Sequence, residues 1–253
     1  MNLPLPKYLA TLVSSPQPVK HTWDAGDDMV ALGNETPAML KNLGALSFRA
    51  VLGLEAALGE WMVARFAHLT KDPTADLVND AVWAASIDYR YLKRDALDFP
   101  DASGPVEGPL RDFNGGSRDI CEAYPDAEFG AVRYLIGSAN LVKYVLPNSK
   151  EFQAWFKSVV QQLPALSKPA ARQAGALDIQ IVKQPPIGVS EAIFGTPLPR
   201  EAYDPSFDIA AADPVALINA MLARIASRPN PYLYTPAELK AAGFPGTPYQ
   251  YPA

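Results

Sequence analysis

The chain has 253 residues, of which 49% are hydrophobic and 19% are charged, as is typical of a globular protein with a substantial core. Its formal net charge of −5 argues against a general nucleic-acid-binding surface, which needs an excess of Lys and Arg, and is compatible with a basic protein partner. The single cysteine, Cys121, excludes an intrachain disulfide and a zinc-finger type of thiolate site, and it indicates a reducing compartment.

Residues 1–35 predict an irregular N-terminal strap that lies across the helices. Prolines at positions 4, 6, 16 and 18 interrupt this segment, a short helix fits Tyr8–Val13, and Trp23 is the expected anchor. The segment lacks the basic start and the continuous apolar run of a signal peptide. We therefore expect a cytoplasmic protein.

Residues 37–69 and 74–99 predict two long helices that form a central αα-hairpin. Thr36 is a good N-cap and Pro37 suits the first helical position. The first helix is apolar around most of its circumference, so it belongs in the middle of the protein. Its three internal glycines predict close approach of neighbouring helices, with a possible kink near Gly53. The short turn at Lys71–Pro73 makes the two helices antiparallel neighbours.

A membrane span is the alternative for the apolar stretch 43–69. Charged residues interrupt it too often for a helix that faces lipid, namely Arg49, Glu55, Glu60 and Arg65. We therefore expect no membrane contact.

Two further long helices complete the predicted core, which spans residues 36–163. Residues 100–116 are rich in Gly, Pro and Asp and predict a loop, followed by one or two helical turns over Ser117–Ala123 and a third long helix over 126–146. A fourth helix starts after Ser149, with apolar residues at helical spacing, and Pro164 is expected to stop it.

The last third of the chain predicts a Pro-rich arm over residues 164–212 and C-terminal helices with a tail over 213–253. A short strand fits residues 177–182, Asp213 caps a helix, and Thr235 opens another with capping-box spacing. The whole pattern predicts a single all-α domain, a helical bundle built on the central hairpin.

Polar residues that interrupt the hairpin are the first candidates for a ligand site: Glu55, Arg65, His68 and Asp88. The helical rise places Asp88 level with Glu55 and Asp76 level with His68. Two carboxylates at one level could share a proton or bind a cation, whereas internal charge pairing is the structural alternative. No Glu-x-x-His motif is present, so no metal site is predicted.

The segment Asn114–Asp119 is the second candidate, because its two glycines precede Ser117 at an expected helix start. Free backbone N–H groups there, with Arg118 nearby, could bind an anion, and an ordinary capped loop is the alternative. Cys121 and Ser117 have no histidine near them in the sequence, so neither a catalytic residue nor a cofactor is predicted.

Trp83 and Arg90 fall on the polar side of the second helix, as residues of a protein interface would. The alternative is that Trp83 packs under the 164–212 arm or the N-terminal strap. Together with the scarcity of His and Cys, such an interface favours a non-enzymatic interaction protein, such as an inhibitor, an immunity-type antidote or an adaptor. The alternative is an enzyme or small-molecule-binding protein with an inter-helix pocket lined by Glu55, Arg65 and Asp88. The sequence predicts no oligomeric state.

Overall fold

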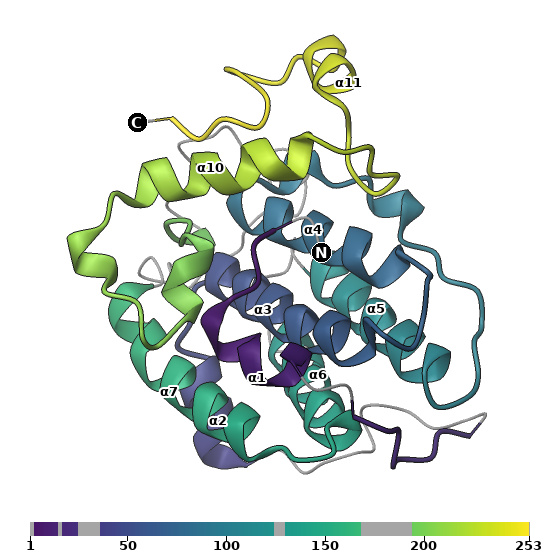
Figure 1. Ribbon diagram of the computed structural model, residues 1–253. Helices are drawn as coiled ribbons and strands as arrows, with labels where there is room; N and C mark the ends of the chain where they lie inside the picture. The colour runs from purple at the N-terminus through teal and green to yellow at the C-terminus, as the bar shows by residue number, and fades with distance from the viewer. Residues whose placement is uncertain (1–2, 15–16, 25–35, 124–129, 168–193, 253) are drawn as a thin grey trace.

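The computed structural model describes residues 3–14, 17–24, 36–123, 130–167 and 194–252. Within these ranges the regular elements are all helices, which confirms the predicted all-α bundle (Figure 1). The described part of the chain also has one isolated antiparallel β-bridge, between Leu92 and Leu233. The α-helices are α1 Ala10–Ser14, α2 Pro37–Leu43, α3 Phe48–Phe66, α4 Thr74–Ile87, α5 Glu107–Glu122, α6 Gly130–Val145, α7 Lys150–Leu166, α10 Pro214–Ala226 and α11 Pro236–Ala241. Short 3-10 helices are η1 Lys7–Leu9, η3 Tyr89–Tyr91, η4 Arg94–Ala96, η5 Arg200–Tyr203 and η6 Ile209–Ala211.

Helix α3 is the centre of the bundle, and every one of its residues except Val63 is buried. It packs against α4, α5 and α6, with α1 and η5 on its remaining sides (Figure 1). This arrangement explains why the helix is apolar around nearly its whole circumference, as the sequence indicates.

The prediction of one continuous helix over 37–69 is wrong, because α2 and α3 are separate. Helix α2 ends at Leu43, and a new N-cap starts α3, where the Ser47 hydroxyl accepts a hydrogen bond from the Ala50 N–H at 3.3 Å. A hydroxyl that caps a helix start satisfies backbone donors that a continuous helix would use internally. The break therefore falls at residues 44–47 and not near Gly53.

Helices α3 and α4 follow each other in the chain and pack against each other, as the predicted hairpin requires. In this contact the indole of Trp83 donates to Glu60 Oε1 at 3.0 Å, and Gly59 lies against Asn79. The second helix is shorter than the predicted 74–99. It ends at Ile87 because Asp88 is extended and its carboxylate accepts from the Arg90 N–H at 3.0 Å, which starts η3.

The predicted loop over 100–116 is wrong for residues 107–116, which belong to α5. This helix buries an apolar face, and Gly108 lies directly under Trp23, where a Cβ would come within 2.2 Å of the indole Cδ1 atom. Gly108, which indicates a loop in the sequence, therefore permits close packing at this helix. Trp23 itself is buried.

Helices α6 and α7 match the third and fourth predicted helices. Helix α6 spans Gly130–Val145 of the predicted 126–146, whose first four residues lie outside the described ranges. Helix α7 buries the predicted apolar face with Phe152, Trp155 and Val159. Pro164 does not stop α7 at once, because the helix continues to Leu166. The strand expected at 177–182 lies outside the described residues.

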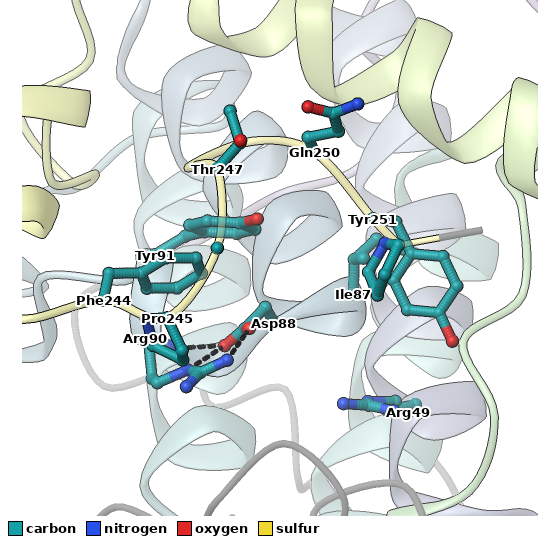
Figure 2. A pocket seen from close by; sticks show the side chains of 12 residues that line it. Arg49, Ile87, Asp88, Arg90, Tyr91, Phe244, Pro245, Thr247, Gln250 and Tyr251 are labelled. Atoms are coloured by element: carbon teal, nitrogen blue, oxygen red, sulfur yellow. Dashed lines mark hydrogen bonds and ion pairs between the residues drawn. The ribbon is translucent and has the colours of Figure 1, made fainter.

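The predicted caps of the C-terminal helices are confirmed. Asp213 accepts hydrogen bonds from the N–H groups of Val215 and Ala216 at 3.0 and 3.2 Å, and α10 packs against α4. Thr235 and Glu238 form a capping box at the start of α11. The chain then folds back as a tail, residues 244–252, onto the end of α4 (Figures 1 and 2). No helix in the described part of the chain is long and apolar enough to cross a membrane.

Gly53 marks a close contact between α3 and η5, and an alanine there should destabilise the fold. A Cβ at position 53 would lie 2.0 Å from the Tyr203 hydroxyl, and the buried tyrosine has little room to move. We expect Gly53→Ala to lower the free energy of unfolding by about 1–3 kcal/mol, as overpacked cores do. Urea denaturation measures the loss.

Gly115→Ala is the matched control, since Gly115 lies inside α5 with no neighbouring atom within 4 Å of a new Cβ. Alanine there should raise the free energy of unfolding by up to about 1 kcal/mol through helix propensity alone. Equal effects at the two positions would contradict the close contact at Gly53.

Candidate functional site

The candidate residues Glu55, Arg65 and Asp88 do not converge in the structure. Glu55 is fully buried between α3, α5 and α6, where the hydroxyls of Ser117 and Ser138 donate to its Oε1 at 2.8 and 2.9 Å. Its second oxygen, Oε2, has no hydrogen-bond partner in the part of the chain that the structure describes. Burial raises the pKa of Glu55 to about 8, so the carboxyl is mainly protonated at neutral pH.

Arg65 is buried and binds three backbone carbonyls. Its guanidinium donates to Val145 at 2.9 Å and to Gln17 and Pro18 at 2.9 and 3.1 Å. Desolvation by burial lowers its pKa. Arg65 thus fastens the N-terminal segment to α3 and to the end of α6.

His68 lies exposed just past the end of α3, and Asp76 does not meet it as expected. The Asp76 carboxylate binds Arg228 Nη1 at 2.8 Å instead. Asp88 follows the last residue of α4 and binds Arg90. Glu55, Arg65 and Asp88 thus have separate hydrogen-bond partners, and neither of the two pockets described here is lined by all three.

Arg118 and Trp83 also lie in surroundings that differ from those expected. Asn114–Asp119 is the interior of α5, so its backbone N–H groups serve the helix, and Arg118 binds the neighbouring Asp119 at 2.9 Å. Trp83 is fully buried, which agrees with the alternative of packing under the arm and not with an exposed interface residue. It packs edge-on against Tyr203 with ring centroids 5.4 Å apart, and so it lies under the C-terminal part of the arm.

Glu60 is the centre of a buried polar network that the sequence does not reveal. Its carboxylate accepts hydrogen bonds from Tyr8, from the Trp83 indole and from Arg200, and only 1% of its side chain is exposed. Burial raises the pKa of Glu60, whereas the Arg200 guanidinium lowers it. The network joins η1, α3, α4 and η5.

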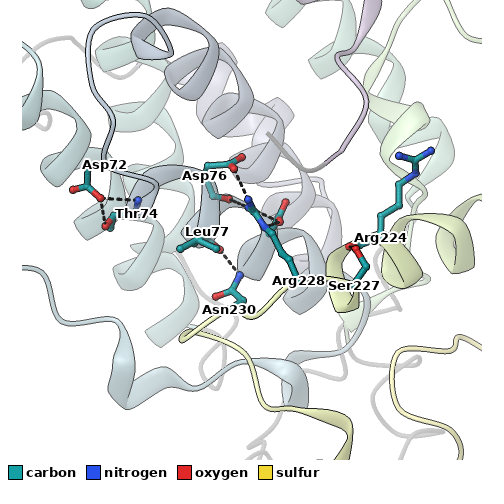
Figure 3. Close-up of polar contacts among 9 residues, drawn as sticks. Asp72, Thr74, Asp76, Leu77, Arg224, Ser227, Arg228 and Asn230 are labelled. Atoms are coloured by element: carbon teal, nitrogen blue, oxygen red, sulfur yellow. Dashed lines mark hydrogen bonds and ion pairs between the residues drawn. The ribbon is translucent and has the colours of Figure 1, made fainter.

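A second cluster joins α4 to the segment after α10, as Figure 3 shows. Arg228 donates to Asp76 at 2.8 Å and to Asp80 at 2.7 and 3.1 Å, and Asn230 donates to the Leu77 carbonyl at 2.8 Å. Burial raises the pKa of Asp80 to about 6. Because the guanidinium already holds both carboxylates, this cluster fastens α10 to the hairpin. No group of three His, Cys, Asp or Glu side chains suited to a metal ion occurs in the described ranges.

The feature best suited to bind a ligand is a pocket of about 340 Å³ between the end of α4 and the tail (Figure 2). The pocket combines two arginines, one carboxylate, aromatic rings and the backbone of a turn. The lining residues come from three segments: Arg49 of α3; Ile87, Asp88, Arg90 and Tyr91; and Phe244, Pro245, Gly246, Thr247, Gln250, Tyr251 and Pro252.

Stacked aromatic side chains hold the tail in place. The Tyr91 ring lies between Tyr249 and Phe244, with centroid distances of 4.4 and 5.4 Å. The backbone N–H of Tyr249 donates to the Tyr91 hydroxyl at 3.1 Å, and Gly246 has a positive φ of 79°, as a Pro-Gly turn requires. Farther along, Tyr251 and Asn219 of α10 exchange two hydrogen bonds of 2.7 and 3.1 Å.

The charged groups of the pocket are held in defined positions. Arg90 forms a two-point ion pair with Asp88 and lies over the Phe244 ring, 4.5 Å from its centroid. Arg49 approaches from α3, and its Nη1 donates to the Gly195 carbonyl at 2.9 Å. Of the residues proposed from the sequence, only Asp88 and Arg90 belong to this pocket.

Sequence reasoning misses the pocket because its two sides lie about 150 positions apart in the chain. The signals in the sequence are the aromatic, Pro-rich tail and Arg49, one of the few charged residues in the apolar stretch 43–69. Comparisons of the chain with models of protein families, with curated proteins and with solved structures found no match.

Proposed function

We propose that the protein binds a small molecule, without chemical conversion, in the pocket between the end of α4 and the C-terminal tail. The observation that carries the proposal is the cavity of about 340 Å³, a size within the range of small-molecule sites. Its lining is also of the expected kind, since apolar and aromatic surface surrounds a small number of fixed polar groups.

The pocket is preorganised in the way a binding site needs. The stacked rings of Tyr249, Tyr91 and Phe244 fix one wall, and the ion pair with Asp88 fixes the position of Arg90. A wall that is already ordered does not lose conformational freedom when a ligand binds, so more of the contact energy appears as affinity.

A fragment screen by ligand-observed NMR tests the proposal. Saturation-transfer spectra of a library of neutral, cationic and anionic fragments are recorded with the wild-type protein and with Pro245→Trp. Pro245 is an exposed residue of the pocket lining, so an indole there should obstruct the cavity. We expect a set of fragments whose signals are present with the wild type and lost with Pro245→Trp.

Ala241→Trp is the matched control, because Ala241 is an exposed residue of α11 that does not line the pocket. This variant should keep the fragment signals, and thermal unfolding should show that both variants are folded. The proposal is rejected if every fragment that binds the wild type also binds Pro245→Trp.

The interpretation as a protein-interaction module stays a prediction that rests on the net charge and the composition. The basic partner and the cytoplasmic location also stay predictions from the sequence. Affinity capture followed by mass measurement separates it from the present proposal. A stoichiometric basic protein would favour the interaction module, whereas a bound metabolite would favour the pocket.

A further inference from the structure

The tail supplies more than half of the pocket lining. Seven of the twelve described lining residues lie between Phe244 and Pro252, and the others belong to α3 and to the segment from the end of α4 through η3 (Figure 2). The cavity therefore exists only while the tail lies against the end of α4. A ligand that contacts both walls binds this closed arrangement and stabilises it by mass action.

Contacts of side chains hold the tail closed. The Tyr249 ring stacks on Tyr91 at a centroid distance of 4.4 Å, and the Tyr249 hydroxyl donates to the Tyr234 carbonyl at 2.6 Å. The Tyr251 N–H donates to Asn219 Oδ1 at 2.7 Å, and Asn219 Nδ2 donates back to the Tyr251 carbonyl at 3.1 Å. Tyr251 lines the pocket and Asn219 does not. Asn219 thus holds a lining residue in place from α10 without bordering the cavity.

The backbone of the tail is in an unfavourable conformation at Tyr249. Its φ of 58° is the only positive φ of a non-glycine residue in the described ranges. A Cβ makes the left-handed region unfavourable, so a residue stays there only where its surroundings fix it. At Tyr249 the ring stack and the hydrogen bonds donated by its N–H and its hydroxyl do so. Opening of the tail would relieve this strain, which brings the open state closer in free energy to the closed one.

From these features we propose that the tail, residues 244–252, is a lid that is closed in most molecules, opens as a unit and is kept closed by a bound ligand. Opening separates the two walls and gives the ligand a route into and out of the cavity. This inference rests on the proposed small-molecule site. Asn219 then holds the lid from outside that site.

Hydrogen exchange of single backbone amides, measured by NMR, tests whether the tail opens as a unit. The reporter is the Tyr249 N–H, because a change at Asn219 does not alter its partner, the Tyr91 hydroxyl. We expect Asn219→Ala to speed the exchange of the Tyr249 amide at least about tenfold. The variant loses both hydrogen bonds to Tyr251, so the lid should open more often.

Gln162→Ala is the matched control. The Gln162 amide on α7 also joins a distant segment, through a hydrogen bond of 3.0 Å to the Ala202 carbonyl, and it lies outside the tail and the pocket lining. This variant should leave the exchange of the Tyr249 amide nearly unchanged, and urea denaturation should show that both variants are folded. Faster exchange confined to Tyr251 in Asn219→Ala, or equal effects of the two variants on Tyr249, would overturn the lid.

A second measurement uses the fragment that binds most tightly among those lost with Pro245→Trp. At a free concentration of about ten times its Kd, this fragment should slow the exchange of the Tyr249 amide about elevenfold, by the factor 1 + [L]/Kd. The amide of Gln153, in the first turn of α7, opens with that helix end and should be unaffected. If such a fragment leaves the Tyr249 amide unchanged, the lid is wrong and the small-molecule site stands. If no fragment depends on Pro245, both fail.

Discussion

Arg200→Met should lower the free energy of unfolding by about 3–5 kcal/mol at neutral pH, the range measured when one partner of a buried ion pair is removed. The cause is Glu60, which lies 1% exposed beneath Arg200 and would keep a buried charge without its cationic partner. The remaining donors are Tyr8 and Trp83, which carry no positive charge. Because burial already raises the pKa of Glu60, the carboxylate should take up a proton more easily in the variant, and the loss should be largest at high pH.

A double-mutant cycle with Glu60→Gln separates the pair from its surroundings. The amide of the glutamine keeps an acceptor for the Trp83 indole and removes the charge, so the double variant should be more stable than Arg200→Met alone. Arg94→Met is the control, since it removes an exposed arginine. Urea denaturation gives the four free energies. Additive effects, or a loss below about 1 kcal/mol for Arg200→Met, would show that the network does not hold η5 against α3.

Glu55→Gln should make the protein more stable relative to the wild type as the pH rises from about 4.5 to about 8. Burial raises the pKa of Glu55 to about 8 from 4.5, so in this window the unfolded chain has lost a proton that the folded protein retains. Each pH unit in the window costs the wild type about 1.4 kcal/mol, which amounts to roughly 3 kcal/mol at pH 7. The glutamine side chain of the variant does not titrate, so the free energy of unfolding of the variant should not fall with pH in this way.

The wild type loses stability as the pH rises because the pKa of Glu55 is higher in the folded protein than in the unfolded chain. Below pH 4.5 the carboxyl is protonated in both states and contributes no dependence on pH; above pH 8 it is ionised in both, and the difference between variant and wild type becomes constant. Unfolding free energies at pH 4.5, 6, 7 and 8.5 measure the trend. Glu151→Gln, which changes an exposed carboxylate on α7, is the control. A difference between Glu55→Gln and wild type that does not depend on pH would contradict the buried, protonated carboxyl.

The sequence predicts the helices whose signals are local. The Asp213 cap, the capping box at Thr235 and the apolar face of α7 each depend on residues within four positions of one another, and all three are confirmed. The first part of α5, residues 107–116, is predicted as a loop because its Gly and Pro residues have two interpretations. A glycine such as Gly108 indicates a loop locally, and only Trp23, which comes from a distant segment, shows that it permits close packing.

The candidate site was predicted only in part, for the same physical reason. Glu60 and Trp83 fall on polar stripes of their helices, and a helical projection places such stripes in solvent. In the structure Arg200 and Tyr203, more than 100 positions away, cover them. The pocket likewise needs the tail to lie beside the end of α4, and no periodic pattern encodes that contact.

The most direct test of the small-molecule site uses the methyl NMR signals of isoleucine. Ile87 lines the pocket, whereas Ile136 of α6 and Ile225 of α10 are buried away from its lining. The protein with labelled isoleucine δ1 methyl groups is titrated with a fragment whose binding depends on Pro245, and Ile87→Val assigns the relevant signal. Binding in the pocket should give a saturable shift of the Ile87 signal, with the signals of Ile136 and Ile225 unchanged. An unchanged Ile87 signal, or saturable shifts confined to the other two, would contradict it.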